Sequence, residues 1–186
     1  MLKITAFFLC LVWHSNLWAQ QENKIAAARY KFSAADSLLT LAVPVKNQLH
    51  QLLKNKKQQE QPLHLVFIAV DKTVNTNTSR WLAAKQQQDI YRVNLSAIVS
   101  KYIGETEKNL AQVFSAAEEK NYILVFDEAD ALFGQRSSNQ KESNSSITYF
   151  LQRIAACKGT IIITCIGDNC VSQLAKQNFI TVAAAQ

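Results

Sequence analysis

Glycine is scarce in this sequence of 186 residues, and it is confined to the second half. Phosphate-binding loops depend on glycine, because the missing side chain lets backbone N–H groups approach the phosphate oxygens. The part of the chain before Gly104 therefore contains no glycine-rich phosphate loop. The four glycines are Gly104, Gly134, Gly159 and Gly167.

The sequence also lacks an apolar run long enough to cross a membrane. The N-terminal run from Ile4 to Trp13 is shorter than the roughly 20 residues that a spanning helix needs. Lys3 precedes this run and a polar segment ending at Ala19 follows it, which is the layout of a secretory signal. We expect residues 1–19 to be a signal peptide, and hence a protein exported to the periplasm or the cell exterior without a membrane anchor. An uncleaved anchor is the alternative.

The positive charge is not accompanied by aromatic residues. The formal net charge is +6, and its densest cluster is Lys54, Lys56 and Lys57 in a glutamine-rich stretch. No aromatic side chain interleaves with these lysines to stack on bases. We therefore expect a solvated helix face and no nucleic-acid partner. A hydrophobic content of 48% suits one globular domain.

Cysteine pairs of the CxxC type and histidine clusters are absent, so we expect no zinc-type metal site. Beyond the signal segment the chain carries Cys157, Cys165 and Cys170, an odd number in a compartment that permits disulfides. One disulfide can form, for example between Cys165 and Cys170, but the sequence leaves the connectivity open.

The most informative stretch is an apolar run that ends in two acids. The run Ile123–Phe126 has the length and composition of a strand buried on both faces of a parallel sheet. Asp127 and Glu128 follow at the carboxyl end of that strand, where open α/β sheets place their ligand crevice. By itself this pattern also suits an ordinary solvated strand end.

Three segments in the same order resemble the AAA family of ATPases. The resemblance spans residues 62–179 and implies a three-layer α/β sandwich with a five-stranded parallel sheet. Residues 62–186 would form an AAA-type core without the family's helical lid, after a helical segment over residues 20–61. The composition of that segment predicts one helix between Gln21 and Leu41 and, after Pro44, a second over about Val45–Gln59. The segments are YRVNLSAIVSKYIGETEKNL (Tyr91–Leu110), NYILVFDEADALFGQR (Asn121–Arg136) and SITYFLQRIAACKGTIII (Ser146–Ile163). The strands are expected near residues 63–70, 90–95, 122–127, 160–165 and 179–184.

The resemblance implies ATP and Mg²⁺ as cofactors and assigns roles to the two acids. In the Walker B motif of the family the residue matching Asp127 holds Mg²⁺, and that matching Glu128 polarises the attacking water. The family's phosphate loop, or Walker A motif, falls on residues 69–76, before a helix expected over residues 79–85. There Asn75 replaces the loop lysine, while Thr73 and the magnesium-binding hydroxyl of Thr76 match the family.

Further catalytic positions depart from the family pattern. Ile166 stands at the polar sensor position, Gln177 and Asn178 stand at the arginine fingers, and Lys72 lies on the wrong side of the loop to replace the lysine. We expect a pseudo-ATPase that acts through protein interaction. The alternatives are a functional ATPase with an atypical phosphate loop and a damaged gene copy without a role. Whether any nucleotide binds is left open.

A second motif points to a protein partner or to a homo-oligomer. Ser100–Gly104, SKYIG, matches the pore loop with which family members grip a polypeptide in the channel of a hexamer. The resemblance implies that Tyr102 and Ile103 form the grip, with Gly104 ending the loop. The alternative is a turn whose tyrosine packs on the edge of the sheet.

Overall fold

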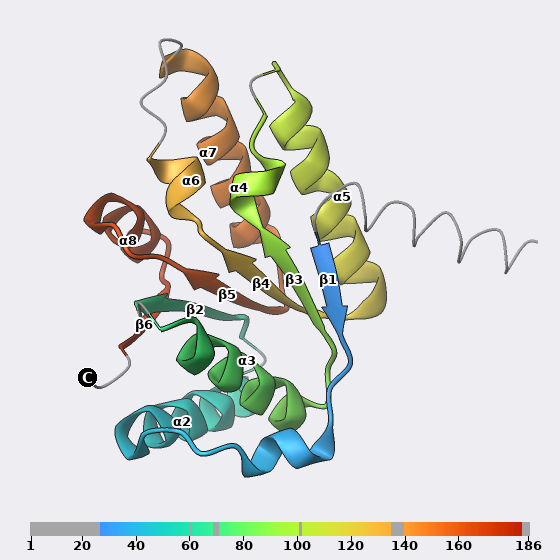
Figure 1. Cartoon of the computed structure of the whole chain (residues 1–186), viewed down its shortest axis with the longest axis vertical. Helices are drawn as coiled ribbons and strands as arrows, with labels where there is room; N and C mark the ends of the chain where they lie inside the picture. Colours follow the sequence, from blue (N-terminus) through green and yellow to red (C-terminus); the bar gives the residue numbers. More distant parts are fainter. Residues whose placement is uncertain (1–26, 60, 69–70, 101, 135–139, 184–186) are drawn as a thin grey trace, which may run out of the picture.

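The computed structural model describes residues 27–59, 61–68, 71–100, 102–134 and 140–183. The expected signal peptide and the start of the N-terminal segment lie outside these residues. A six-stranded sheet forms the middle layer, in the order β1-β3-β4-β5-β2-β6 (Figure 1). Five strands are parallel, as expected, and β1 is antiparallel at one edge. The strands are β1 (Ala27–Tyr30), β2 (Leu63–Ile68), β3 (Ile90–Asn94), β4 (Ile123–Asp127), β5 (Thr160–Thr164) and β6 (Ile180–Ala183).

Helices cover both faces of the sheet, which completes the expected three-layer α/β sandwich. Helices α2 and α3 lie on one face, and α5 and α7 lie on the other (Figure 1). Within the part of the chain that the structure describes, no helix has the length and apolar character needed to cross a bilayer. The helices are the 3₁₀ helix η1 (Ala34–Leu38), α2 (Val43–Gln59), α3 (Lys72–Gln86), α4 (Leu95–Ile98), α5 (Glu105–Lys120), α6 (Asp130–Phe133), α7 (Gln140–Ala156) and α8 (Asp168–Ala175).

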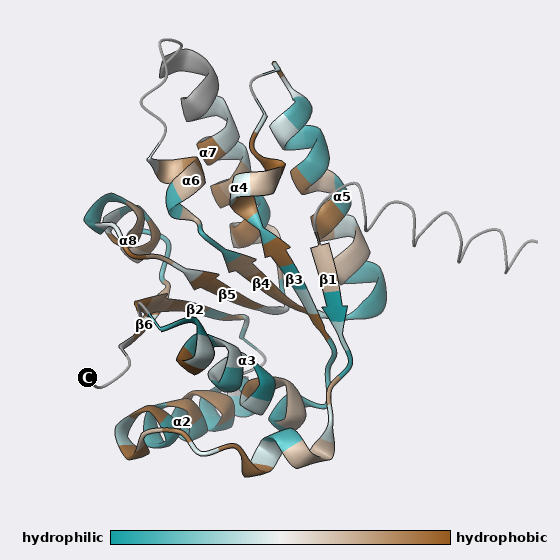
Figure 2. Ribbon diagram, viewed as in Figure 1, coloured by the Kyte–Doolittle hydropathy of each residue, from teal (hydrophilic) through white to brown (hydrophobic). Residues whose placement is uncertain are grey.

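The central strands are buried on both faces, which explains their continuous apolar sequence (Figure 2). Successive side chains of a strand point to opposite faces. In β4, Leu124 and Phe126 therefore join the core under α5 and α7, whereas Ile123 and Val125 join the core under α2 and α3. The strand predicted from this apolar run is confirmed.

The α-helix expected between Gln21 and Leu41 is not found among the residues that the structure describes, where only the short 3₁₀ helix η1 is helical. Ala27–Tyr30 instead forms β1, which pairs with β3 in the register Ala27↔Val93 and Tyr30↔Ile90. The open edge of β3 offers backbone hydrogen bonds, and this tertiary pairing outweighs the weak helical preference of a four-residue segment. The second predicted helix of this region is confirmed as α2.

Helix α3 begins earlier than the family's phosphate loop permits. We expected a loop over residues 69–76 and a helix from residue 79, but α3 already starts at Lys72. The carboxylate of Asp71 accepts a hydrogen bond from the backbone N–H of Thr73 and caps the helix. Without glycine to hold an open loop, this cap lets the helix form at once. Residues 69 and 70 lie outside the described part of the chain.

Candidate functional site

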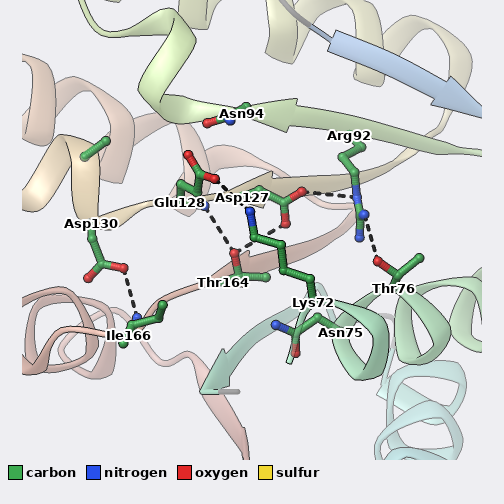
Figure 3. Close-up of a pocket in the computed structure, with 11 residues that line it drawn as sticks. Lys72, Asn75, Thr76, Arg92, Asn94, Asp127, Glu128, Asp130, Thr164 and Ile166 are labelled. Carbon is green, nitrogen blue, oxygen red and sulfur yellow. Dashed lines mark hydrogen bonds and ion pairs between the residues drawn. The ribbon is translucent and has the colours of Figure 1, made fainter. Parts of the chain in front are cut away.

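A cavity of about 550 Å³ lies at the carboxyl ends of β3, β4 and β5, beside the first turns of α3 (Figure 3). Asp127 and Glu128 of the β4 end line it, together with Thr76 and Asn75 of α3. The structure therefore brings four of the predicted site residues to one place. Thr73 is exposed and does not line this cavity.

Arg92 connects two of these predicted residues. Its Nε lies 3.3 Å from Oδ2 of Asp127, and its Nη1 donates a hydrogen bond of 3.0 Å to Oγ1 of Thr76. Asp127 is paired with Asn94 on β3, so Arg92, two residues earlier, projects from the same face of the sheet. A single guanidinium thus bridges the aspartate and the threonine (Figure 3).

Glu128 is held by groups from three other elements. Lys72 Nζ of α3 lies 3.1 Å from its Oε1, and Ser96 Oγ of α4 donates to its Oε2 at 3.0 Å. Its backbone N–H donates to Oγ1 of Thr164 on β5, and its φ of 56° lies in the left-handed region. That backbone conformation is strained for a residue with a side chain, and such strain gathers at functional sites.

The two acids differ in their protonation behaviour. Burial raises the pKa of Asp127 above its usual value, although Arg92 and the hydroxyl of Thr164 act in the opposite direction. Hydrogen bonds from Lys72, and then from Ser96, lower the pKa of Glu128. The protein therefore keeps Glu128 ionised more firmly than Asp127.

Asp130 ties the start of α6 to the segment that follows β5. Its Oδ2 accepts a hydrogen bond of 2.9 Å from the backbone N–H of Ile166, and its Oδ1 accepts one of 2.8 Å from that of Gly167. The Ile166 side chain, at the expected sensor position, lines the cavity and is 66% exposed. Gln177 and Asn178, at the expected arginine-finger positions, lie between α8 and β6 and do not line the cavity.

The loop before α5 is exposed. Tyr102 is 66% exposed and Ile103 is 82% exposed, which disfavours a tyrosine packed on the sheet edge. Gly104 adopts a φ of 74°, and its backbone carbonyl accepts the N–H of Lys108 in the first turn of α5. A side chain at this position would be strained, so glycine is needed for the turn.

Arg92 and Thr164 are two of the site residues that sequence analysis missed, together with Ser96 and Asp130. A signal for Arg92 was present, since an arginine stands in the middle of a mostly apolar strand, two residues before the polar Asn94. Thr164 donates to Oδ1 of Asp127 at 3.3 Å and is a polar strand end that matches no family motif we used. Lys72 was placed on the wrong side of the phosphate loop to replace its lysine, and no partner was predicted for it, whereas in the structure its Nζ pairs with Glu128.

A parallel sheet between helical layers, with an acidic strand end at its ligand crevice, defines a P-loop NTPase type of fold. The family described as "ATPase family associated with various cellular activities (AAA)" matches residues 67–186. The chain belongs to the AAA family.

Relatives in this family resemble only part of the chain. Fidgetin-like protein 1 of Caenorhabditis briggsae is 34% identical over 84 residues, which cover 44% of this chain and 14% of that protein. Vacuolar protein sorting-associated protein 4 of Dictyostelium discoideum is 36% identical over 72 residues, covering 38% of this chain and 16% of the relative. Vacuolar protein sorting-associated protein 4B of Mus musculus is 40% identical over 63 residues, which cover 33% of this chain and 14% of that protein. The chain thus matches about a seventh of the length of these relatives.

The side chains around the cavity can be tested for their fit to the Mg²⁺ ion that is expected in this family. Mg²⁺ prefers oxygen ligands in a nearly octahedral shell, and Asp127 and Thr76 carry suitable oxygens. Both side chains contact Arg92 in this structure. The arrangement fits Mg²⁺ only if Arg92 moves away.

Proposed function

We propose that this AAA domain is a pseudo-ATPase that acts by binding another protein. The observation that carries the proposal is the double contact of Arg92 with Asp127 and Thr76, the two side chains that the family would use for magnesium. The guanidinium serves there as a built-in cation. A divalent ion about 4 Å from it would be repelled by about 8 kcal/mol at an effective dielectric constant of about 20.

The phosphate side of the cavity supports the same proposal. The first turn of α3 already has an anion, the exposed carboxylate of Asp71, where the family would place a phosphate. The ammonium group of Lys72, which lines the cavity, is paired with Glu128. Two cationic and three anionic side chains line the cavity, so its net charge disfavours a nucleoside triphosphate. The cations are Lys72 and Arg92, and the anions are Asp127, Glu128 and Asp130.

Calorimetry with Mg-ATP and the purified protein tests this proposal. We expect no binding in the micromolar range and no steady hydrolysis. The alternative, a functional ATPase with an atypical phosphate loop, would instead give micromolar binding that Asp127→Asn abolishes, or turnover that Glu128→Gln abolishes. Either result would remove the pseudo-ATPase proposal.

The exposed loop of Tyr102 and Ile103 is the surface that we propose for the protein partner or for a second copy of the chain. Exposed aromatic and aliphatic side chains anchor interfaces because they bury apolar area on contact. Cross-linking followed by mass spectrometry compares the wild type with Tyr102→Ala, and Leu38→Ala serves as a control at another exposed apolar residue. Equal recovery of partners by the wild type and Tyr102→Ala would assign the contact to another surface.

We also propose that the protein is exported. The support is the signal-like N-terminus together with the disulfide between Cys165 and Cys170, because disulfides persist in oxidising compartments. Mass spectrometry of the N-terminus from fractionated cells should find a chain that begins after Ala19. Intact Met1 in the cytoplasmic fraction would contradict export.

A further inference from the structure

The disulfide between Cys165 and Cys170 lies beside the carboxylate of Asp130. The two sulfur atoms and a carboxylate oxygen all lie within 4.8 Å of one another. Among the residues that the structure describes, this is the one group of three such side chains close enough to share a metal ion. We propose that Cys165, Cys170 and Asp130 bind one divalent ion of the zinc type in the reduced protein, and that the disulfide excludes it.

The backbone already holds the two cysteines at a suitable separation. Their Cα atoms are 6.1 Å apart. A tetrahedral zinc ion with Zn–S bonds of about 2.3 Å holds two sulfurs about 3.8 Å apart. Once the S–S bond is broken, small side-chain rotations of Cys165 and Cys170 therefore bring both thiolates into position.

Asp130 is oriented as metal-binding carboxylates commonly are. The backbone N–H groups of Ile166 and Gly167 each donate to one of its oxygens. An ionised carboxylate has about four lone-pair sites, so two remain for a metal ion, and such outer hydrogen bonds fix the orientation of a ligand. Gly167 permits the approach, because a Cβ there would lie 2.8 Å from Oδ1 of Asp130.

Burial and charge favour thiolate ligands at this place. Cys165 and Cys170 are each 1% exposed, so a bound ion would be shielded from most of the solvent. Cys170 is the third residue of α8, and the positive end of a helix stabilises a thiolate. Asp130 and Ile166 also line the 550 Å³ cavity, which gives a metal ion a route of entry and a water molecule a route to the fourth position.

The chemistry balances in two steps. A dithiol reductant gives two electrons and two protons to the disulfide, which becomes two thiols while the reductant becomes a cyclic disulfide. The divalent ion then displaces one proton from each thiol to solvent, and binds two thiolates and the carboxylate. Two thiolates and one carboxylate suit zinc among the common divalent ions. This site could not be predicted from the sequence, because Asp130 lies in α6, whereas Cys165 follows β5 and Cys170 lies in α8.

A titration of the full chain with Co²⁺, a spectroscopic probe for zinc sites, tests the proposal. After reduction and removal of the reductant, we expect a near-ultraviolet charge-transfer band of the intensity that two thiolates give, with release of two protons per bound ion. The oxidised protein should give no band. Failure of the fully reduced protein to give the band would overturn the proposal.

Matched variants identify the ligands. Cys165→Ser combined with Cys170→Ser should abolish the band, and Asp130→Asn should weaken Co²⁺ binding at least tenfold. Cys10→Ser combined with Cys157→Ser should leave the band unchanged, as should Asp168→Asn at an exposed position. Circular dichroism of each variant checks that it folds. A band that survives loss of Cys165 and Cys170, or that disappears with Cys10 and Cys157, would contradict the assignment.

Discussion

The Nε of Arg92 lies 3.3 Å from Oδ2 of Asp127, and this ion pair joins β3 to β4 at the floor of the cavity. The two side chains are 29% and 27% exposed, so their attraction is less screened by water than that of a surface pair. Arg92→Met should lower the free energy of unfolding by about 1–2 kcal/mol, because it leaves Asp127 without its cationic partner. Urea unfolding of Arg92→Met, Asp127→Asn and the double variant measures the coupling. A coupling energy of zero would show that the contact has no energetic role.

The same variant should alter the dependence of stability on pH. Arg92 lowers the pKa of Asp127, so its removal raises the folded-state pKa further above the unfolded value of about 3.9. An acid with a raised folded-state pKa stabilises the fold at low pH and loses that contribution as pH rises through the folded pKa. The deficit of Arg92→Met relative to the wild type should therefore be smallest near pH 4 and grow towards neutral pH. A deficit independent of pH would contradict this origin.

A buried acid fastens the N-terminal segment to α3. Asp36 is 3% exposed, accepts a hydrogen bond of 2.7 Å from the hydroxyl of Tyr30, and pairs with Arg80 Nη2 at 2.8 Å. Burial raises the pKa of Asp36, but hydrogen bonds from Tyr30, Ser33 and Arg80 lower it more, and the net shift is downward.

Asp36→Asn should therefore lower the free energy of unfolding by about 2–3 kcal/mol at neutral pH, because it removes the negative charge that pairs with Arg80. An acid with a lowered folded-state pKa stabilises the fold above its unfolded pKa and loses that contribution as pH falls through the folded pKa. The stabilities of the wild type and Asp36→Asn should thus begin to converge as pH falls below about 4, and should become equal only below the lowered folded-state pKa of Asp36. Denaturation across pH measures this, with the exposed Asp168→Asn as the control. A difference in unfolding free energy between the wild type and Asp36→Asn that stayed constant down to the lowest pH measured would refute this role of the Asp36 charge.

The aromatic cluster under α7 supports the central strand. Phe126 is fully buried, and its ring centroid lies 5.0 Å from that of Phe150 in an edge-to-face arrangement. Phe126→Ala should destabilise the fold by about 3–5 kcal/mol because it leaves a cavity. Tyr102→Ala removes a ring of similar size at an exposed position and should change stability by less than about 0.5 kcal/mol. Similar losses for both variants in thermal unfolding would contradict the burial of the strand.

Gly167 should tolerate no side chain without a movement of Asp130. A Cβ at Gly167 would lie 2.8 Å from Oδ1 of Asp130, whereas a Cβ at Gly159 would meet its nearest neighbour, Sγ of Cys157, at an ordinary 3.6 Å. Gly167→Ala should cost about 1–2 kcal/mol and Gly159→Ala much less. Urea unfolding of the two variants measures the difference. If Gly159→Ala proved the more harmful, the packing described for Asp130 would be wrong.

Much of the central sheet could be predicted from the sequence, because apolar runs such as Leu63–Ile68 and Ile123–Phe126 report strands buried on both faces. The edge strand β1 could not be predicted in this way. Its sequence, AARY, carries no alternation, and its conformation depends on the edge of β3, which is distant in the chain. The start of α3 was missed for a related reason, since the family's loop was assumed at a place where Asp71 caps a helix.

Within the candidate site, the residues to which the family resemblance assigns a role could be predicted from the sequence. Asp127, Glu128 and Thr76 were identified, and the structure places all three at one cavity. Arg92 was missed because the family resemblance assigns no role to its position, and its partners follow only from the strand register and the position of α3. The resemblance therefore locates the site, whereas the charge balance inside it depends on residues to which it assigns no role.

We propose that Arg92 takes the place of a metal ion between Asp127 and Thr76. Electron paramagnetic resonance of Mn²⁺ with ATP, a probe for magnesium sites, tests this role of Arg92. The wild type should leave the amplitude of the Mn-ATP signal unchanged, as in buffer without protein. A bound Mn²⁺ signal in the wild type that disappears with Asp127→Asn would show that a metal ion, and not Arg92, occupies this place.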